Sequence, residues 1–163
     1  MLHNSRRLFL QTSFLSTAVL IMSGSEVFSA VTPIKTINLV QNDLFPFAKA
    51  LHVETDSYIN IILNHSRVTD EDKIFIRNGV QWLNEEAVKM YKKTYTNLDS
   101  KKRESVLQKI AKERWGESWI DAMLSYIMEA IFSDKIYGVN SRESAQKWLG
   151  FLNGLPRPQK ALL

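Results

Sequence analysis

SWIDAMLSYIMEAIF, residues 118–132, is the stretch that most strongly indicates the fold of this 163-residue chain. Its apolar side chains recur at steps of three and four and would cover more than one face of a helix; they are Trp119, Ile120, Met123, Leu124, Ile127, Met128, Ile131 and Phe132. Asp121, Ser125 and Glu129 leave only a narrow polar stripe. Ser118 and Asp121 have the spacing of a capping box, which would begin the helix. We therefore expect a central, largely buried helix.

Three further helical patterns precede this stretch. Tyr58, Ile61, Ile62 and His65 fall on one face of a short helix. A capping box at residues 69–72 begins a second pattern, with an apolar stripe of Ile76, Val80, Leu83, Ala87 and Met90 or Tyr91. This stripe belongs to one long helix or to two that meet near Gly79, because glycine costs a helix about 1 kcal/mol relative to alanine. Asp99 is suited to be the N-cap of the third pattern, which buries Val106, Leu107 and Ile110 and would end at Gly116.

The third pattern also carries a basic face, made of Lys101, Lys102, Arg103, Lys109 and Lys112. Such a face is usually solvated surface. The alternative is a patch that meets an acidic partner.

Residues 31–57 show the least regular pattern. Pro33 and Pro46 are expected to break any helix, and residues 34–40 alternate loosely. We predict an extended arm whose apolar residues, Phe45 and Phe47 among them, are buried on the domain's own core or on another chain. The expected fold is thus mostly α: a small single domain of about four to six helices over residues 58–155, with an irregular N-terminal arm, a loop-rich C-terminus and a tail at 156–163.

Composition excludes several kinds of chemistry. The chain has no cysteine, so it has no thiolate nucleophile, no covalent haem attachment and no cysteine-ligated iron–sulfur cluster. Its six glycines are scattered and form no dinucleotide-binding loop. The formal net charge of +4 is mild, and we expect no nucleic acid partner. We predict no catalytic, cofactor-binding or metal-binding residues in this chain.

The N-terminus has the layout of a bacterial export signal: a charged start, an apolar run to Met22 and then small residues. Residues 5–11, SRRLFLQ, resemble the twin-arginine consensus S/T-R-R-x-F-L-K through Arg6, Arg7 and Phe9. Polar residues interrupt the run, which disfavours a membrane anchor because an anchor needs about 18 apolar residues. An ordinary secretory signal is the rival interpretation. We assign residues 1–30 to this signal and expect periplasmic delivery of a folded chain.

A signature lies at the C-terminal end. EAIFSDKIYGVN, residues 129–140, followed by WLGF, residues 148–151, resembles the pattern E-G-x-F-x-D-P-x-Y-G-G-N…W-x-x-x-G-F of gluconate 2-dehydrogenase subunit 3. Ala130, Lys135 and Val139 depart from it. Loop residues after a buried helix and nearby aromatics suit recognition, so the candidate partner contacts are Asp134, Tyr137, Gly138, Asn140, Trp148, Gly150 and Phe151. The alternative is that Trp148 and Phe151 close the domain's own core.

The resemblance implies an accessory role. Similar subunits are the non-catalytic small (gamma) subunits that accompany a large FAD subunit, which oxidises gluconate or a related sugar acid or polyol. Electrons commonly pass to a multihaem cytochrome c subunit, and the complex is associated with the inner membrane. The small subunit would escort the large one through the twin-arginine translocase. The alternative function is an independent periplasmic helical adaptor or binding protein.

Overall fold

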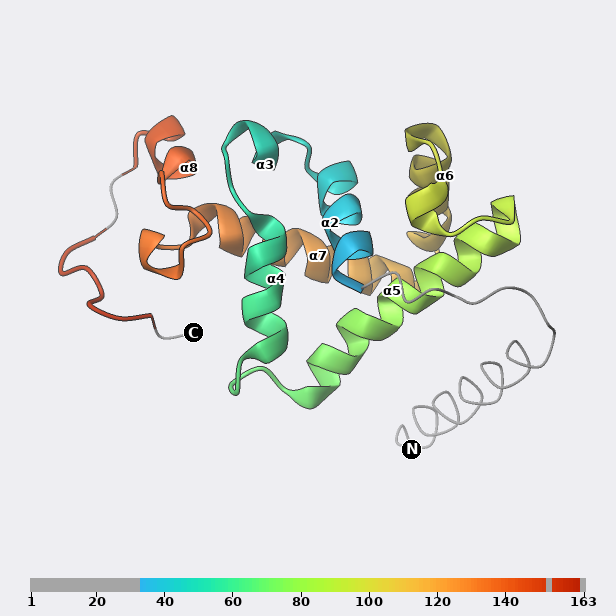
Figure 1. The fold of residues 1–163 in the computed structure, drawn as a ribbon, viewed down its shortest axis with the longest axis horizontal. Coiled ribbons are helices and arrows are strands. Elements are labelled where there is room, and N and C mark those ends of the chain that lie inside the picture. Colours follow the sequence, from blue (N-terminus) through green and yellow to red (C-terminus); the bar gives the residue numbers. More distant parts are fainter. Residues whose placement is uncertain (1–32, 152–153, 162–163) are drawn as a thin grey trace. The chain divides into compact units, whose positions relative to one another are not determined.

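The computed structural model describes residues 33–151 and 154–161 and shows only helices and loops in them (Figure 1). The mostly α prediction is confirmed. The α-helices are α2 (Pro33–Leu44), α3 (Phe47–Ala50), α4 (Thr55–Asn64), α5 (Asp70–Tyr91), α6 (Ser100–Ile110), α7 (Arg114–Phe132) and α8 (Ser144–Trp148). Two 3₁₀ turns, η1 (Tyr95–Asn97) and η2 (Lys135–Tyr137), lie between them. The predicted export signal with Arg6, Arg7 and Phe9 lies outside the described residues, and none of the described helices is long and apolar enough to cross a membrane.

The prediction of an extended arm over residues 31–57 is wrong, because most of this segment is helical. Pro33 is the first residue of α2, a position that needs no backbone N–H and therefore tolerates proline. Pro46 lies between α2 and α3, where it interrupts neither helix. Ile37, Val40 and Leu44 follow the helical spacing of three and four residues, which the loose alternation of residues 34–40 had obscured.

Helix α2 lies in the middle of the domain, packed against α4, α5, α6, α7 and η1. Ile37 and Val40 are completely buried and Phe45 packs against the core, as the first of our two alternatives expected, whereas Phe47 is 43% exposed. Side-chain hydrogen bonds also hold the C-terminal end of α2 in place. The Asp43 carboxylate accepts hydrogen bonds from Arg103 Nε at 2.6 Å and from the Tyr95 hydroxyl at 2.7 Å. Burial and the bond to Asp43 raise the pKa of Tyr95.

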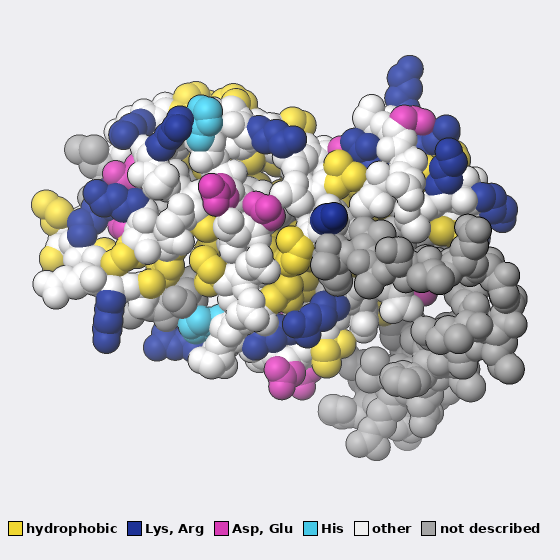
Figure 2. Space-filling model, viewed as in Figure 1, with side chains coloured by type: hydrophobic (Ala, Val, Ile, Leu, Met, Phe, Trp, Pro, Cys, Tyr) yellow, Lys and Arg dark blue, Asp and Glu magenta, His cyan; other side chains and the backbone are white. Residues whose placement is uncertain are grey.

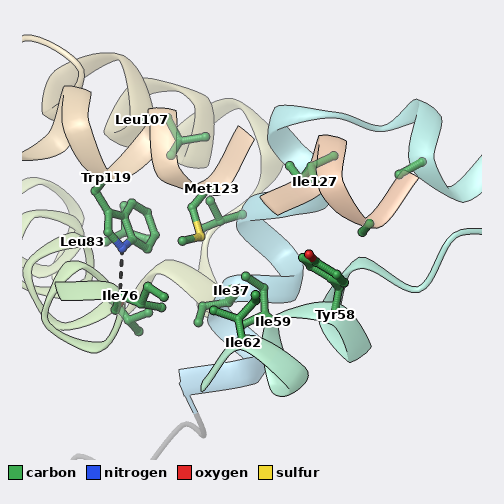
Figure 3. Close-up of a cluster of buried hydrophobic side chains, with 14 of the residues drawn as sticks. Ile37, Tyr58, Ile59, Ile62, Ile76, Leu83, Leu107, Trp119, Met123 and Ile127 are labelled. Carbon is green, nitrogen blue, oxygen red and sulfur yellow. Dashed lines mark hydrogen bonds between the residues drawn. The ribbon is translucent and has the colours of Figure 1, made fainter. Parts of the chain in front are cut away.

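Helix α5 is one long helix, and its glycine marks the contact with α7. The completely buried Trp119 of α7 lies over Gly79, and its indole Nε1 donates a hydrogen bond to the Ile76 carbonyl at 3.2 Å (Figure 3). A β-carbon at position 79 would lie 2.0 Å from this nitrogen. Glycine is therefore used here for close approach between two helices and does not divide α5.

Helix α7 begins earlier than the sequence pattern indicated. It starts at Arg114 with Glu113 as N-cap, and the Ser118 hydroxyl donates to the Arg114 carbonyl at 3.0 Å within the helix. The predicted capping box at Ser118 is thus wrong. Gly116 does not end the preceding helix but lies in the first turn of α7, where a β-carbon would approach the Ile110 carbonyl oxygen to 2.1 Å. The tight corner between α6 and α7 therefore requires glycine. In the sequence alone, this residue looks like a glycine that ends a helix.

The remaining helix predictions are largely confirmed. The Thr69 hydroxyl and the Asp99 carboxylate accept hydrogen bonds from the first-turn amides of α5 and α6. The predicted apolar stripes are buried at Ile76, Val80, Leu83, Ala87, Val106, Leu107 and Ile110, whereas at the end of α5 Tyr91 is half-buried and Met90 is exposed. On α7, Trp119, Met123, Ile127 and Ile131 are buried, whereas Met128 and Phe132 are exposed. Helix α7 is therefore central along one broad face only, and its C-terminal end leaves apolar surface exposed.

Candidate partner interface

The signature loop begins at the C-terminal end of α7 and is held there by side chains of its own. The last carbonyl groups of a helix have no partner within the helix. Asn140 Nδ2 donates to the Ile131 carbonyl and to Gln146 Oε1, each at 2.7 Å, and Gln146 Nε2 donates to the Phe132 carbonyl at 3.2 Å. Asn140 is only 1% exposed. Its side chain therefore shapes the loop from inside and does not form part of the surface.

Asp134 holds the next turn of the loop. Its carboxylate accepts hydrogen bonds from the Ile136 amide at 3.0 Å and from Arg157 Nη1 at 2.7 Å, which hold the pKa of Asp134 below its usual value. Arg157 also forms an ion pair with Glu143, so the C-terminal segment is fastened to both sides of the loop. The family-signature aspartate is thus engaged within the chain.

The glycine of the loop closes η2. Gly138 has φ of +80°, a conformation that residues with a β-carbon rarely adopt. Val139, where the family pattern has a second glycine, is buried, and its carbonyl accepts a hydrogen bond from the Glu54 amide at 3.0 Å. This bond connects the loop to the segment between α3 and α4.

Tyr137 is half-buried and packs against the core. Close by, the Tyr58 hydroxyl donates to the signature residue Glu129 at 2.9 Å, which connects α4 to α7. Burial, followed by this hydrogen bond, raises the pKa of Tyr58. These residues of the signature therefore hold neighbouring elements together.

The aromatic residues of the signature are on the surface. Trp148 is 65% exposed and Phe151 57%. They do not close the domain's own core, so that alternative is wrong. Gly150, between them, has φ of +66° and turns the chain between the two rings. Trp148 contacts Phe47 of α3, with ring centroids 5.6 Å apart at 62°.

We call the exposed group of Phe47, Trp148, Leu149 and Phe151 the aromatic patch. The sequence pattern indicated that Trp148 and Phe151, and also Phe47, could be available to a partner, but it did not predict that Phe47 contacts Trp148. The irregular spacing of apolar residues around Pro46 was the only sign that Phe47 would lack a place in the core.

One other candidate surface, the basic face, is less suited to binding. On the basic face, Arg103 points inward to Asp43, and Lys102 and Lys109 form ion pairs with Asp99 and Glu113. Among the described residues, no three His, Asp or Glu side chains lie together in a way that would hold a metal ion. The aromatic patch is thus the most prominent candidate site in the part of the chain that the structure describes.

Comparison with known proteins gives one finding. The family model of gluconate 2-dehydrogenase subunit 3 matches residues 34–154, which run from the second residue of α2 to beyond α8 and include the whole signature. Neither curated proteins nor solved structures gave a match. The matched region takes in α2, which the signature alone did not reach. The chain therefore belongs to the gluconate 2-dehydrogenase subunit 3 family, which implies that it is the small subunit of such a dehydrogenase complex.

Proposed function

We propose that this chain is the non-catalytic small subunit of a periplasmic, FAD-dependent dehydrogenase of sugar acids or polyols. It escorts the large flavin subunit through twin-arginine export and stabilises the assembled complex. The observation that carries the proposal is the family match over residues 34–154. The twin-arginine pattern at Arg6, Arg7 and Phe9 supports the route.

The composition of the core is consistent with folding before export. The chain has no cysteine, so its stability does not depend on disulfides that form only in an oxidising compartment. Its buried residues, from Ile37 of α2 to Ala145 of α8, come from all along the described sequence. A chain that can complete this core in the reducing cytoplasm can bind its partner there and carry it across the membrane.

Cofactors belong to the partners in this proposal. The large subunit binds FAD and oxidises the substrate, and a cytochrome c subunit with covalently attached haem receives the electrons. This chain has neither a dinucleotide-binding glycine loop nor a cysteine for haem attachment. Its association with the inner membrane would come through the complex.

The proposal is tested by producing the chain together with a candidate large flavoprotein subunit from the same genome and following dye-linked dehydrogenase activity in cell fractions. We expect the two chains to purify together and the activity to be periplasmic. Changing Arg6→Lys together with Arg7→Lys should leave both chains and the activity in the cytoplasm. Normal periplasmic delivery of this double variant would contradict the twin-arginine route, and failure of any flavoprotein to purify with the chain would favour an independent adaptor.

A further inference from the structure

We infer that the aromatic patch is the surface on which the large dehydrogenase subunit docks, and that this subunit presents an apolar recess bordered by acidic side chains. The inference rests on the proposed function, since it identifies where the partner binds. It goes further by assigning the contact to α3, α8 and residue 151.

The first support is the chemistry of the patch. Single exposed apolar residues are common on protein surfaces, but a contiguous group is not. Trp148, Leu149 and Phe151 are near neighbours in sequence, and Phe47 adjoins Trp148 through an edge-on ring contact. The ring centroids of Phe47 and Phe45 are in turn 6.3 Å apart, and Phe45 packs against the core. Large aromatic side chains dominate the binding energy of protein interfaces.

The second support is that the patch is held in place before any partner arrives. Asn140 and Gln146 fasten the base of α8 to the end of α7, and the Glu54 amide connects the loop to the α3 side. The Phe151 amide donates to the Gln146 carbonyl at 2.8 Å. A surface ordered in advance loses little conformational entropy on binding, which favours affinity.

The third support is the charge around the patch. Lys49 of α3, Lys147 of α8 and Arg142 just before α8 are exposed, and they form no ion pair within the described part of the chain. The neighbouring carboxylates of Asp134 and Glu143 are engaged by Arg157. Figure 2 shows basic and apolar side chains side by side at the end of the domain where Figure 1 places α8. An acidic border on the partner would complement this surface.

A lipid surface would also attract aromatic and basic side chains, but the geometry favours a protein. Helices that lie in a membrane interface present a long amphipathic face. Here α3 has four residues and α8 has five, and the patch joins two separate segments. Membership of the subunit family independently implies another subunit as partner.

The first test measures affinity of the full chain for the co-produced large subunit. We compare Trp148→Ser and Phe151→Ser with Ile74→Ser, a matched control on α5 that is 49% exposed. Each patch variant should weaken binding by about 30-fold or more, equivalent to about 2 kcal/mol, while the control changes it by less than about threefold. Wild-type affinity in both patch variants would overturn the inference. If the wild-type chain itself fails to bind a flavoprotein, the proposed function fails instead.

The second test does not depend on the stability of a variant. A photo-crosslinking amino acid at position 151 should join the chain to the large subunit in the assembled complex, whereas the same group at position 74 should not. Crosslinks from position 74 but not from 151 would overturn the inference, as would crosslinks from 151 only to a second copy of this chain.

The third test addresses the charge border. Reversing Lys49 and Lys147 to Glu should lower the association rate at least about fivefold at low salt, with the difference shrinking at high salt. Reversing Lys101 and Lys112 near α6 is the matched control and should change the rate little. Equal effects of the two pairs would contradict an acidic border.

If the Trp148→Ser chain loses binding to anionic phospholipid vesicles but keeps its affinity for the large subunit, the patch is a membrane contact and the inference is wrong.

Discussion

Replacing Gly79 with alanine sets two physical effects against each other, and the structure decides which is larger. In an ordinary helix interior this change stabilises by about 1 kcal/mol, because alanine has the higher helix propensity. At position 79 of α5, however, the new β-carbon would lie 2.0 Å from Nε1 and 2.1 Å from Cδ1 of Trp119. The indole must then move by more than about 1 Å in a close-packed core.

The cost of that movement has two parts. Overpacking of a core typically costs about 1–3 kcal/mol. Displacing the buried indole also breaks its 3.2 Å hydrogen bond to the Ile76 carbonyl, and an unsatisfied buried donor costs about 1–3 kcal/mol. After subtracting the propensity gain, we expect Gly79→Ala to lower the free energy of unfolding by about 3 kcal/mol. For a domain of this size the thermal midpoint should fall by about 10 °C.

The measurement is urea and thermal unfolding of the purified chain, followed by circular dichroism. Ser118→Ala is the control, because it raises helix propensity at an exposed position of α7 without a clash, and it should be neutral or slightly stabilising. Combining Gly79→Ala with Trp119→Phe should destabilise less than the sum of the two single changes, since the smaller ring relieves the clash. A Gly79→Ala chain as stable as wild type or more so would refute the assigned contact between α5 and α7.

Three further predictions use the same unfolding measurement. Asn140→Asp removes the donor that faces the Ile131 carbonyl and Gln146 Oε1, and should lower the free energy of unfolding by about 2–4 kcal/mol. The same change at the exposed Asn97 is the control, and equal effects would contradict a structural role for Asn140. Because Tyr95 has a raised pKa in the folded chain, its neutral hydroxyl stabilises the fold below a pH of about 10, and this contribution is lost as the pH rises further. Stability should therefore fall above about pH 10, and less steeply in Tyr95→Phe; an unchanged slope would show that this tyrosine is not responsible. Gln41 is buried with no hydrogen-bond partner for its amide among the described residues, so Gln41→Met should stabilise the chain by about 1 kcal/mol or more, and a loss of stability would reveal a partner for the amide.

The candidate site was only partly readable from the sequence. The signature covers the region that contains most of the aromatic patch, and Trp148 and Phe151, which the structure exposes, were among the predicted contacts. It could not separate them from Asn140, which is equally typical of a loop but lies in the interior. Whether a loop asparagine is buried depends on whether unpaired carbonyl groups lie within reach of its side chain. For Asn140 these carbonyl groups are at the end of α7. Phe47 joins Trp148 across a long stretch of chain, a contact that no local spacing specifies.

The sequence by itself determined the helical class, the N-caps at Thr69 and Asp99, the buried stripes of α5 and α6, and the family. All of these depend on the spacing of residues within one or two helical turns, which the chain carries locally. Only the tertiary structure decided that α2 is a central helix, that Gly79 accommodates Trp119, and that the aromatic patch joins α3 to α8. Those features depend on which distant segments pack against each other. In a sequence, proline and glycine indicate the end of a helix, although in the fold either residue can begin a helix or let two helices meet.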